Sequence, residues 1–162
     1  MTTLTTTDFM LAMAVAAALV LLTVLIHYEA LRLITLLLPR VSVAPRMRIL
    51  VVILGVFAAH TVEVWVFGLC YWFLSGTLGG VSGHMSGHLL DYVYFSVVVY
   101  TSLGFGDIQP YELLRLVAGV EALVGLLMIG WSASFTYLMM EKLWGEHQPG
   151  SGAKGRSPGA RD

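Results

Sequence analysis

Residues 101–107, TSLGFGD, place two glycines on either side of a phenylalanine, directly after the apolar aromatic segment DYVYFSVVVY. Gly104 and Gly106 tolerate positive φ angles, which residues with a Cβ resist. Alternating such glycines with Leu103 and Phe105 turns successive carbonyl oxygens toward one axis, where rings of oxygen can replace the hydration shell of an ion. Non-helical backbone at membrane depth must line water or be buried in protein, so we expect this stretch to line an aqueous path.

A second set of polar residues lies inside apolar segments. His60 and Glu63 share a helix face at spacing i, i+3, and Glu121 lies in a later apolar segment. Counted from the outer helix ends at about 1.5 Å per residue, both carboxylates lie about 13–17 Å deep. Charged groups at that depth face protein or water.

Three interpretations of these polar residues remain open. The carboxylates could brace residues 101–107 from behind and make the path pH-sensitive through desolvation and mutual repulsion. They could instead form a hydrogen-bond cluster that only fixes helix packing. His60 and Glu63 could also be half of a metal site, although the sequence shows no second histidine-rich partner at that depth.

The remaining residues with reactive side chains carry weaker signals. His84 and His88 lie four residues apart in the glycine-rich segment 75–90, and they would either bind a metal, sense external pH or simply be solvated. Cys70 is the single cysteine, which excludes a disulfide framework, and it is expected to be a small apolar helix residue. A net charge of −1 argues against a nucleic-acid partner.

The composition indicates which elements must position these residues. The chain is 57% hydrophobic and 12% charged, with a mean hydropathy of +0.81, which is typical of a membrane protein. A helix needs about 20 apolar residues to cross the hydrocarbon, and three segments are long enough: 9–26, 49–74 and about 113–140. The helical part of 91–100 is too short to span, so we expect it to enter the membrane and turn back.

The placement of basic residues predicts the orientation, because short loops rich in Lys and Arg stay cytoplasmic. Segment 75–90 has no Lys or Arg. Such residues occur in the connection between the first two spans and in the tail: Arg32, Arg40, Arg46, Arg48, Lys142, Lys154, Arg156 and Arg161. The N-terminus is therefore expected outside and the C-terminus inside. Residues 27–38 would be an interfacial piece or an extension of the first helix. Segment 145–162 is rich in Gly, Pro and Ser, which is typical of a disordered tail.

The motif Thr101-Ser102-Leu103-Gly104-Phe105-Gly106-Asp107, with Pro110 after it, resembles the TVGYG selectivity filter of the potassium channel superfamily. Over about residues 55–141 the chain is similar to small bacterial members of the two-transmembrane ion channel family. HTVEVWVFGLCY resembles their outer helix, YFSVVVYTSLGFGDI their pore helix and filter, and RLVAGVEALVG their inner helix, with Gly125 at the hinge position. Phe105 lacks the phenol that usually ties the filter to the pore helix, so the resemblance implies a less rigid filter.

The resemblance implies an all-α membrane protein with three transmembrane helices, a re-entrant pore helix and a selectivity filter, assembled as a homotetramer in the cell (inner) membrane. We expect an N-terminal helix with an amphipathic linker (1–47), a pore domain (48–144) and the tail (145–162). The expected function is passive, potassium-selective conduction without a voltage sensor, and no catalysis. No cofactor is expected, and no metal apart from permeating K⁺. A non-conducting scaffold or accessory subunit, or an intramembrane enzyme using the buried carboxylates, are the rivals.

The last span must line the cavity along one stripe. Counting from Gly125 at helical spacing selects four residues for the cavity and inner gate: Leu126, Ile129, Ala133 and Tyr137. The resemblance selects the same four, although both counts start from Gly125. Tyr137 would either narrow the path at the cytoplasmic end or anchor the helix at the interface.

Overall fold

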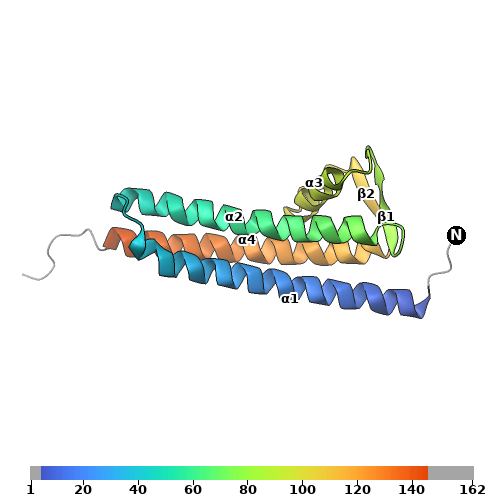
Figure 1. Cartoon of the computed structure of the whole chain (residues 1–162), viewed down its shortest axis with the longest axis horizontal. Coiled ribbons are helices and arrows are strands. Elements are labelled where there is room, and N and C mark those ends of the chain that lie inside the picture. Colours follow the sequence, from blue (N-terminus) through green and yellow to red (C-terminus); the bar gives the residue numbers. More distant parts are fainter. Residues whose placement is uncertain (1–4, 146–162) are drawn as a thin grey trace, which may run out of the picture.

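Three long helices lie side by side in the structure, a computed structural model that describes residues 5–145 (Figure 1). All three are long and apolar enough to cross a membrane: α1 (Thr6–Leu37), α2 (Pro45–Leu74) and α4 (Leu114–Gly145). The predicted all-α architecture with three such helices is confirmed. Residues 146–162, for which a disordered tail was expected, lie outside the described residues.

The first helix is longer than the predicted span 9–26, because residues 27–37 continue it without a break. A capping box begins it: the Thr5 hydroxyl accepts the Asp8 N–H at 3.2 Å, and the Asp8 carboxylate accepts the Thr5 N–H at 2.9 Å. A short 3₁₀ turn, η1 (Leu38–Arg40), leads toward α2. Since α2 begins at Pro45, the expected domain boundary at residue 48 falls inside this helix.

The short helix α3 (Leu89–Tyr100) has 12 residues and lies beside α2 at one end of the three helices (Figure 1). Its first turn is held by Asp91, whose carboxylate accepts the backbone N–H groups of Ser86 at 2.7 Å and His88 at 3.2 Å. Helices α2 and α3 approach closely at Gly68, where a Cβ would lie 2.9 Å from the Cα of Val93. A small residue is needed there for this packing.

Two short strands, which the sequence patterns did not predict, flank α3 and residues 101–107 along the chain. Strand β1 (Gly79–Gly83) pairs antiparallel with β2 (Ile108–Glu112), and Gly83 lies opposite Ile108. The sheet therefore fixes the chain immediately after Asp107. His84 and His88 follow β1 and are both exposed.

The interior is built mainly from apolar and aromatic side chains at the end that carries α3. Tyr71 of α2 packs edge-on against Phe95 of α3, with ring centroids 5.0 Å apart, and both side chains are almost fully buried. At the opposite end a smaller cluster joins η1, α2 and α4: Leu38, Val52, Met139 and Leu143. Many large apolar side chains on the outer faces remain exposed, as expected of helices surrounded by lipid or by other chains.

Candidate functional site

Residues 101–107 form an extended loop between α3 and β2, and all seven are exposed on the single chain. The backbone alternates: Ser102, Gly104 and Gly106 have φ angles of 56°, 58° and 80°, whereas Leu103 and Phe105 are not among the positive-φ residues. The alternation expected for Gly104 and Gly106 is present, and Ser102 extends it by one step. Such alternation can bring successive carbonyls to one side of the chain, which is the geometry of a carbonyl-lined ion path.

The loop is tied to α3 at both of its ends. At the start, the N–H groups of Thr101 and Leu103 donate to the carbonyls of Val97 and Val98 at 3.1 and 3.0 Å. At the end, the Tyr94 hydroxyl donates to the Asp107 carboxylate at 2.9 Å, and this hydrogen bond raises the pKa of Tyr94. A hydroxyl of α3 therefore holds the loop at Asp107, two residues after Phe105.

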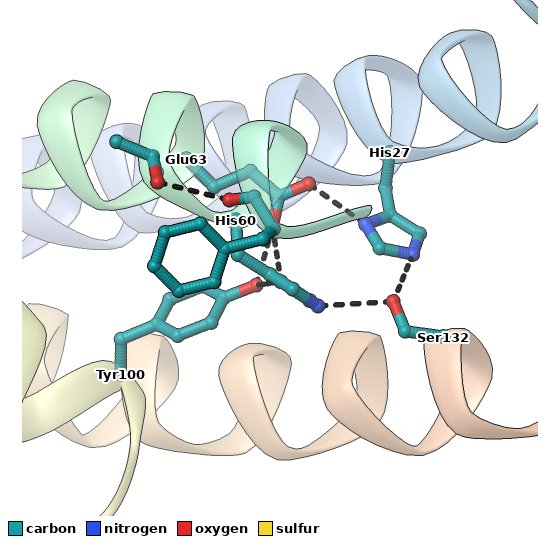
Figure 2. Close-up of polar contacts among 7 residues, drawn as sticks. His27, His60, Glu63, Tyr100 and Ser132 are labelled. Carbon is teal, nitrogen blue, oxygen red and sulfur yellow. Dashed lines mark hydrogen bonds and ion pairs between the residues drawn. The ribbon is translucent and has the colours of Figure 1, made fainter. Parts of the chain in front are cut away.

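Five polar residues meet in the interior beside the end of α3, and we call them the Glu63 cluster: His27, His60, Glu63, Tyr100 and Ser132 (Figure 2). His27 and Glu63 are fully buried, and His27 Nδ1 lies 2.9 Å from Glu63 Oε1. His60 Nδ1 lies 3.3 Å from Glu63 Oε2 and 2.9 Å from the Tyr100 hydroxyl, which also donates to Glu63 Oε2. Ser132 Oγ lies 3.1 Å from His27 Nε2 and 2.9 Å from His60 Nε2.

A second buried carboxylate belongs to a separate set, the Glu121 cluster of Tyr71, Ser96 and Glu121. The Tyr71 hydroxyl donates to Glu121 Oε2, and the Ser96 hydroxyl lies within hydrogen-bond distance of Glu121 Oε1, each at 2.5 Å. Ser96 Oγ also lies 2.9 Å from the Val64 carbonyl oxygen. Glu121 and Ser96 are fully buried, and no basic side chain contacts Glu121 among the described residues.

The structure brings His60 and Glu63 together, as predicted, but places Glu121 in a cluster of its own. Each carboxylate reaches a hydroxyl of α3: Glu63 contacts Tyr100, directly before the loop, and Glu121 contacts Ser96. Sequence reasoning missed the other partners: His27 and Tyr100 beside Glu63, and Tyr71 and Ser96 beside Glu121. His27 was the available signal, since it is a histidine at the end of an apolar run, but the predicted span stopped one residue before it.

The cavity and gate residues proposed on α4 lie on its uncovered surface. Leu126 and Tyr137 are each 61% exposed and Ile129 is 38% exposed, and Ala133 is exposed as well. Gly125, the expected hinge, is buried, and a Cβ there would collide with the carbonyl oxygen of Tyr100. The absence of a side chain at this glycine allows α4 to pack against the end of α3.

A cavity of about 280 Å³ opens beside the Glu63 cluster. Its lining includes His60 and Tyr100, together with Thr101 at the start of the loop and Ile129 of α4. The cavity thus connects the edge of the polar cluster to two residues expected near the ion path.

A comparison with known protein families gives one match. The model of a family described as "Ion channel", of the two-transmembrane potassium-channel type, matches residues 46–142, which is more than half of the chain. No curated protein matches the chain. No solved structure matches it. The matched part begins one residue into α2 and ends near the end of α4, so it contains α3, the loop 101–107 and both carboxylates. The chain therefore belongs to this ion channel family, within the potassium-channel-like superfamily.

Proposed function

We propose that the protein is a potassium-selective channel in which residues Thr101–Asp107 of four identical chains form one carbonyl-lined filter. The observation that carries this proposal is the alternating backbone, with positive φ at Ser102, Gly104 and Gly106 in a loop that is exposed throughout. The filter motif supports potassium over other ions, because the resemblance to TVGYG extends through both glycines and the hydroxyl of Ser102.

Assembly follows from the number of carbonyls that one chain supplies. A single loop offers one column of oxygens, whereas replacing the hydration shell of an ion takes rings of oxygens around an axis. On the single chain, Ser102, Gly104 and Gly106 border an open hollow of about 310 Å³, which neighbouring chains would cover. Closed cyclic symmetry is the usual way in which identical chains surround an axis.

The proposed ion path begins at the outer end of the filter and continues along α4. Ions lose water near Asp107, pass the carbonyls of Ser102 to Phe105 in single file, and reach a water-filled cavity along the exposed stripe of α4. Several weak sites in a row allow ions to displace one another. The C-terminal end of α3 lies directly before Thr101, so its negative dipole end favours a cation there.

The orientation proposed from the arginines is compatible with the positions of the helix ends in the structure. Helix α1 begins at the end that carries the sheet and α3, and the α1–α2 connection lies at the opposite end, near the end of α4 (Figure 1). Arg48 and Lys142 line one pocket at that end. Basic residues on one side support a cytoplasmic position for that side, and with it a filter mouth and an N-terminus outside the cell.

Purified protein in potassium-loaded liposomes tests the function. We expect potassium flux well above sodium flux, and no flux from Gly104→Ala. The Cβ meets no atom within 4 Å at Gly104, so the loss would come from the positive φ that alanine resists. Gly76→Ala is the matched control, because Gly76 also has a positive φ and open space around it but is not part of residues 101–107.

Equal permeability to sodium would overturn the selectivity. Absence of any flux from a correctly assembled wild type would favour the alternative, a pore-like scaffold or accessory subunit. A conductance curve that needs several gating charges per chain would contradict the absence of a voltage sensor, which we propose because no span carries an arginine ladder.

Cysteine substitution tests the proposed gate. Tyr137→Cys and Ala133→Cys, in a background with Cys70 replaced, should react with a thiol reagent from the cytoplasmic side and lose current. Leu138→Cys is the matched control, since Leu138 is as exposed as Tyr137 but lies one residue off the stripe. Equal block at Leu138, or no block at Tyr137 and Ala133, would show that the stripe is assigned to the wrong face.

A further inference from the structure

We propose that His27, His60 and Glu63 bind a divalent transition-metal ion of the zinc class, a site that joins α1 to the pore unit. Each residue offers one ligand atom, and these three atoms lie within 4.8 Å of one another. Four-coordinate zinc with bonds of about 2.0–2.1 Å places its ligand atoms about 3.3 Å apart. His27 Nδ1 lies 2.9 Å from Glu63 Oε1, and His60 Nδ1 lies 3.3 Å from Glu63 Oε2. Each histidine is therefore near that spacing from one oxygen of the carboxylate, and the three side chains would shift slightly to share one ion.

The chemistry of the donor set fits this class of metal. Two imidazoles and one carboxylate suit zinc, cobalt and nickel better than magnesium or calcium, which prefer oxygen ligands only. Three protein ligands leave a fourth position open. The Tyr100 hydroxyl contacts both His60 Nδ1 and Glu63 Oε2, so it lies beside this group of ligand atoms.

The protons of the metal-free cluster do not match its contacts. With both imidazoles neutral, His27 and His60 carry one N–H each, and Ser132 and Tyr100 one O–H each. Ser132 Oγ lies between two Nε2 atoms, and both Nδ1 atoms face Glu63 (Figure 2). If both Nδ1 atoms carry the proton, Ser132 faces two bare nitrogens with one hydrogen. If one histidine carries its proton on Nε2 instead, its Nδ1 has no proton for the contact with Glu63. With both histidines neutral and Glu63 ionised, the contacts need one proton more than the groups supply.

A metal on the Nδ1 side removes this mismatch. Imidazoles that bind a metal through Nδ1 carry their proton on Nε2, and ligating histidines usually donate that proton to a fixed acceptor. Ser132 Oγ has two lone pairs and lies 3.1 and 2.9 Å from the two Nε2 atoms. It can accept both, so one serine would orient both histidine ligands.

The position of the site gives an access route and a role. His60 and Tyr100 line the cavity of about 280 Å³ that also touches Thr101 and Ile129. His27 comes from α1, outside the part of the chain that the family model matches. A bound ion would therefore fasten the additional helix to α2 next to the start of the filter. The binding itself does not depend on conduction.

The test uses metal-free purified full-length protein in detergent, titrated with Co²⁺ and followed by visible absorption. We expect saturable binding of one ion per chain with the absorption of a four-coordinate nitrogen and oxygen site, and displacement by Zn²⁺. His27→Gln and Glu63→Gln should lose this absorption. Ser132→Ala should weaken the affinity about 10- to 100-fold, as loss of an orienting partner does.

Glu63→Gln is expected to fold at least as well as the metal-free wild type. Its amide N–H can donate to His27 Nδ1 while its carbonyl accepts from Tyr100, which supplies the missing proton but removes the carboxylate ligand. Its loss of Co²⁺ binding would therefore not be a loss of structure. Size-exclusion chromatography checks the assembly of each variant.

Two controls are matched to these variants. Ser134→Ala removes a hydroxyl two residues from Ser132 that bonds only the Gly130 carbonyl among the contacts described, and its affinity should be unchanged. His84→Ala with His88→Ala removes the exposed loop histidines and should leave binding unchanged too. The proposal is overturned if the wild type binds neither ion, if Glu63→Gln binds like the wild type, or if the loop variant abolishes binding.

Discussion

The two buried carboxylates behind α3 are alike in depth but differ in the partners that surround them. Glu63 meets two histidines and a phenol, whereas Glu121 meets two hydroxyl groups. Both hydroxyls of the Glu121 cluster can donate to the carboxylate, and Ser96 shares its single hydrogen between Glu121 Oε1 and the Val64 carbonyl. The Glu63 cluster differs in holding two imidazole nitrogens beside its carboxylate, and neutral imidazole is a common metal ligand. Similar position in a helix therefore does not imply a similar role: the Glu121 cluster is suited to packing, and the Glu63 cluster is suited to binding a cation.

The largest difference should appear when each carboxylate is truncated. Glu63→Ala leaves His27, His60 and Tyr100 without a shared acceptor, and each buried polar group left unpaired costs about 1–3 kcal/mol. We expect a loss of at least about 3 kcal/mol in the free energy of unfolding. Glu121→Ala should cost less, because Ser96 keeps the Val64 carbonyl as its partner. Unfolding in detergent measures both, and the reverse order would contradict the comparison.

Gly125 lies between the two clusters on the buried face of α4, one turn after Glu121 and two turns before Ser132. Gly125→Ala should lower the free energy of unfolding by about 1–3 kcal/mol, the usual cost of overpacking, because the new Cβ collides with the Tyr100 carbonyl. Gly119→Ala is the control on the same helix. It has open space, and alanine in place of a helical glycine is favourable by up to about 1 kcal/mol. Equal effects at both sites would show that α4 does not depend on this close approach.

Double-mutant cycles test whether the clusters are independent. Tyr71→Phe and Ser96→Ala share Glu121 and should show a coupling energy of about 0.5–3 kcal/mol. Tyr71→Phe and Tyr100→Phe share no partner among the contacts described, so their effects should add within about 0.5 kcal/mol. Strong coupling in the second pair would mean that α3 responds to both carboxylates as one unit.

The smallest effect is expected at the exposed tie from α3 to the filter. Tyr94→Phe removes the hydrogen bond to Asp107 and should make potassium current decline faster during sustained recording, with little change in unfolding. Because this bond raises the pKa of Tyr94, the tie is present at neutral pH and is lost as pH rises through the raised value. The difference between the ultraviolet titrations of wild type and Tyr94→Phe should show a phenol whose pKa is raised above its usual value. A phenol with the usual pKa would argue against the hydrogen bond from Tyr94 to Asp107.

The sequence by itself determined the membrane spans, the short helix and the loop chemistry of residues 101–107. These features depend on local properties, namely the length of apolar runs and the φ freedom of glycine. The positive φ at Gly104 and Gly106 followed directly from residue type. Ser102 did not, because its backbone is set by the alternation of the loop around it. The strands were missed because their glycine-rich sequence has little strand propensity, and they form by pairing across the segment between them.

Only the tertiary structure decided which polar residues meet. Counting about 1.5 Å per residue places His27 about 31 Å from the outer end of α1 and Glu63 about 17 Å from the outer end of α2, so the sequence gives no reason to pair them. They meet because α1 extends beyond α2 at that end (Figure 1). The relative shift of two helices is set by side-chain packing along their whole contact. For the same reason Glu121, which shares the depth of Glu63, lies with Tyr71 and Ser96 instead.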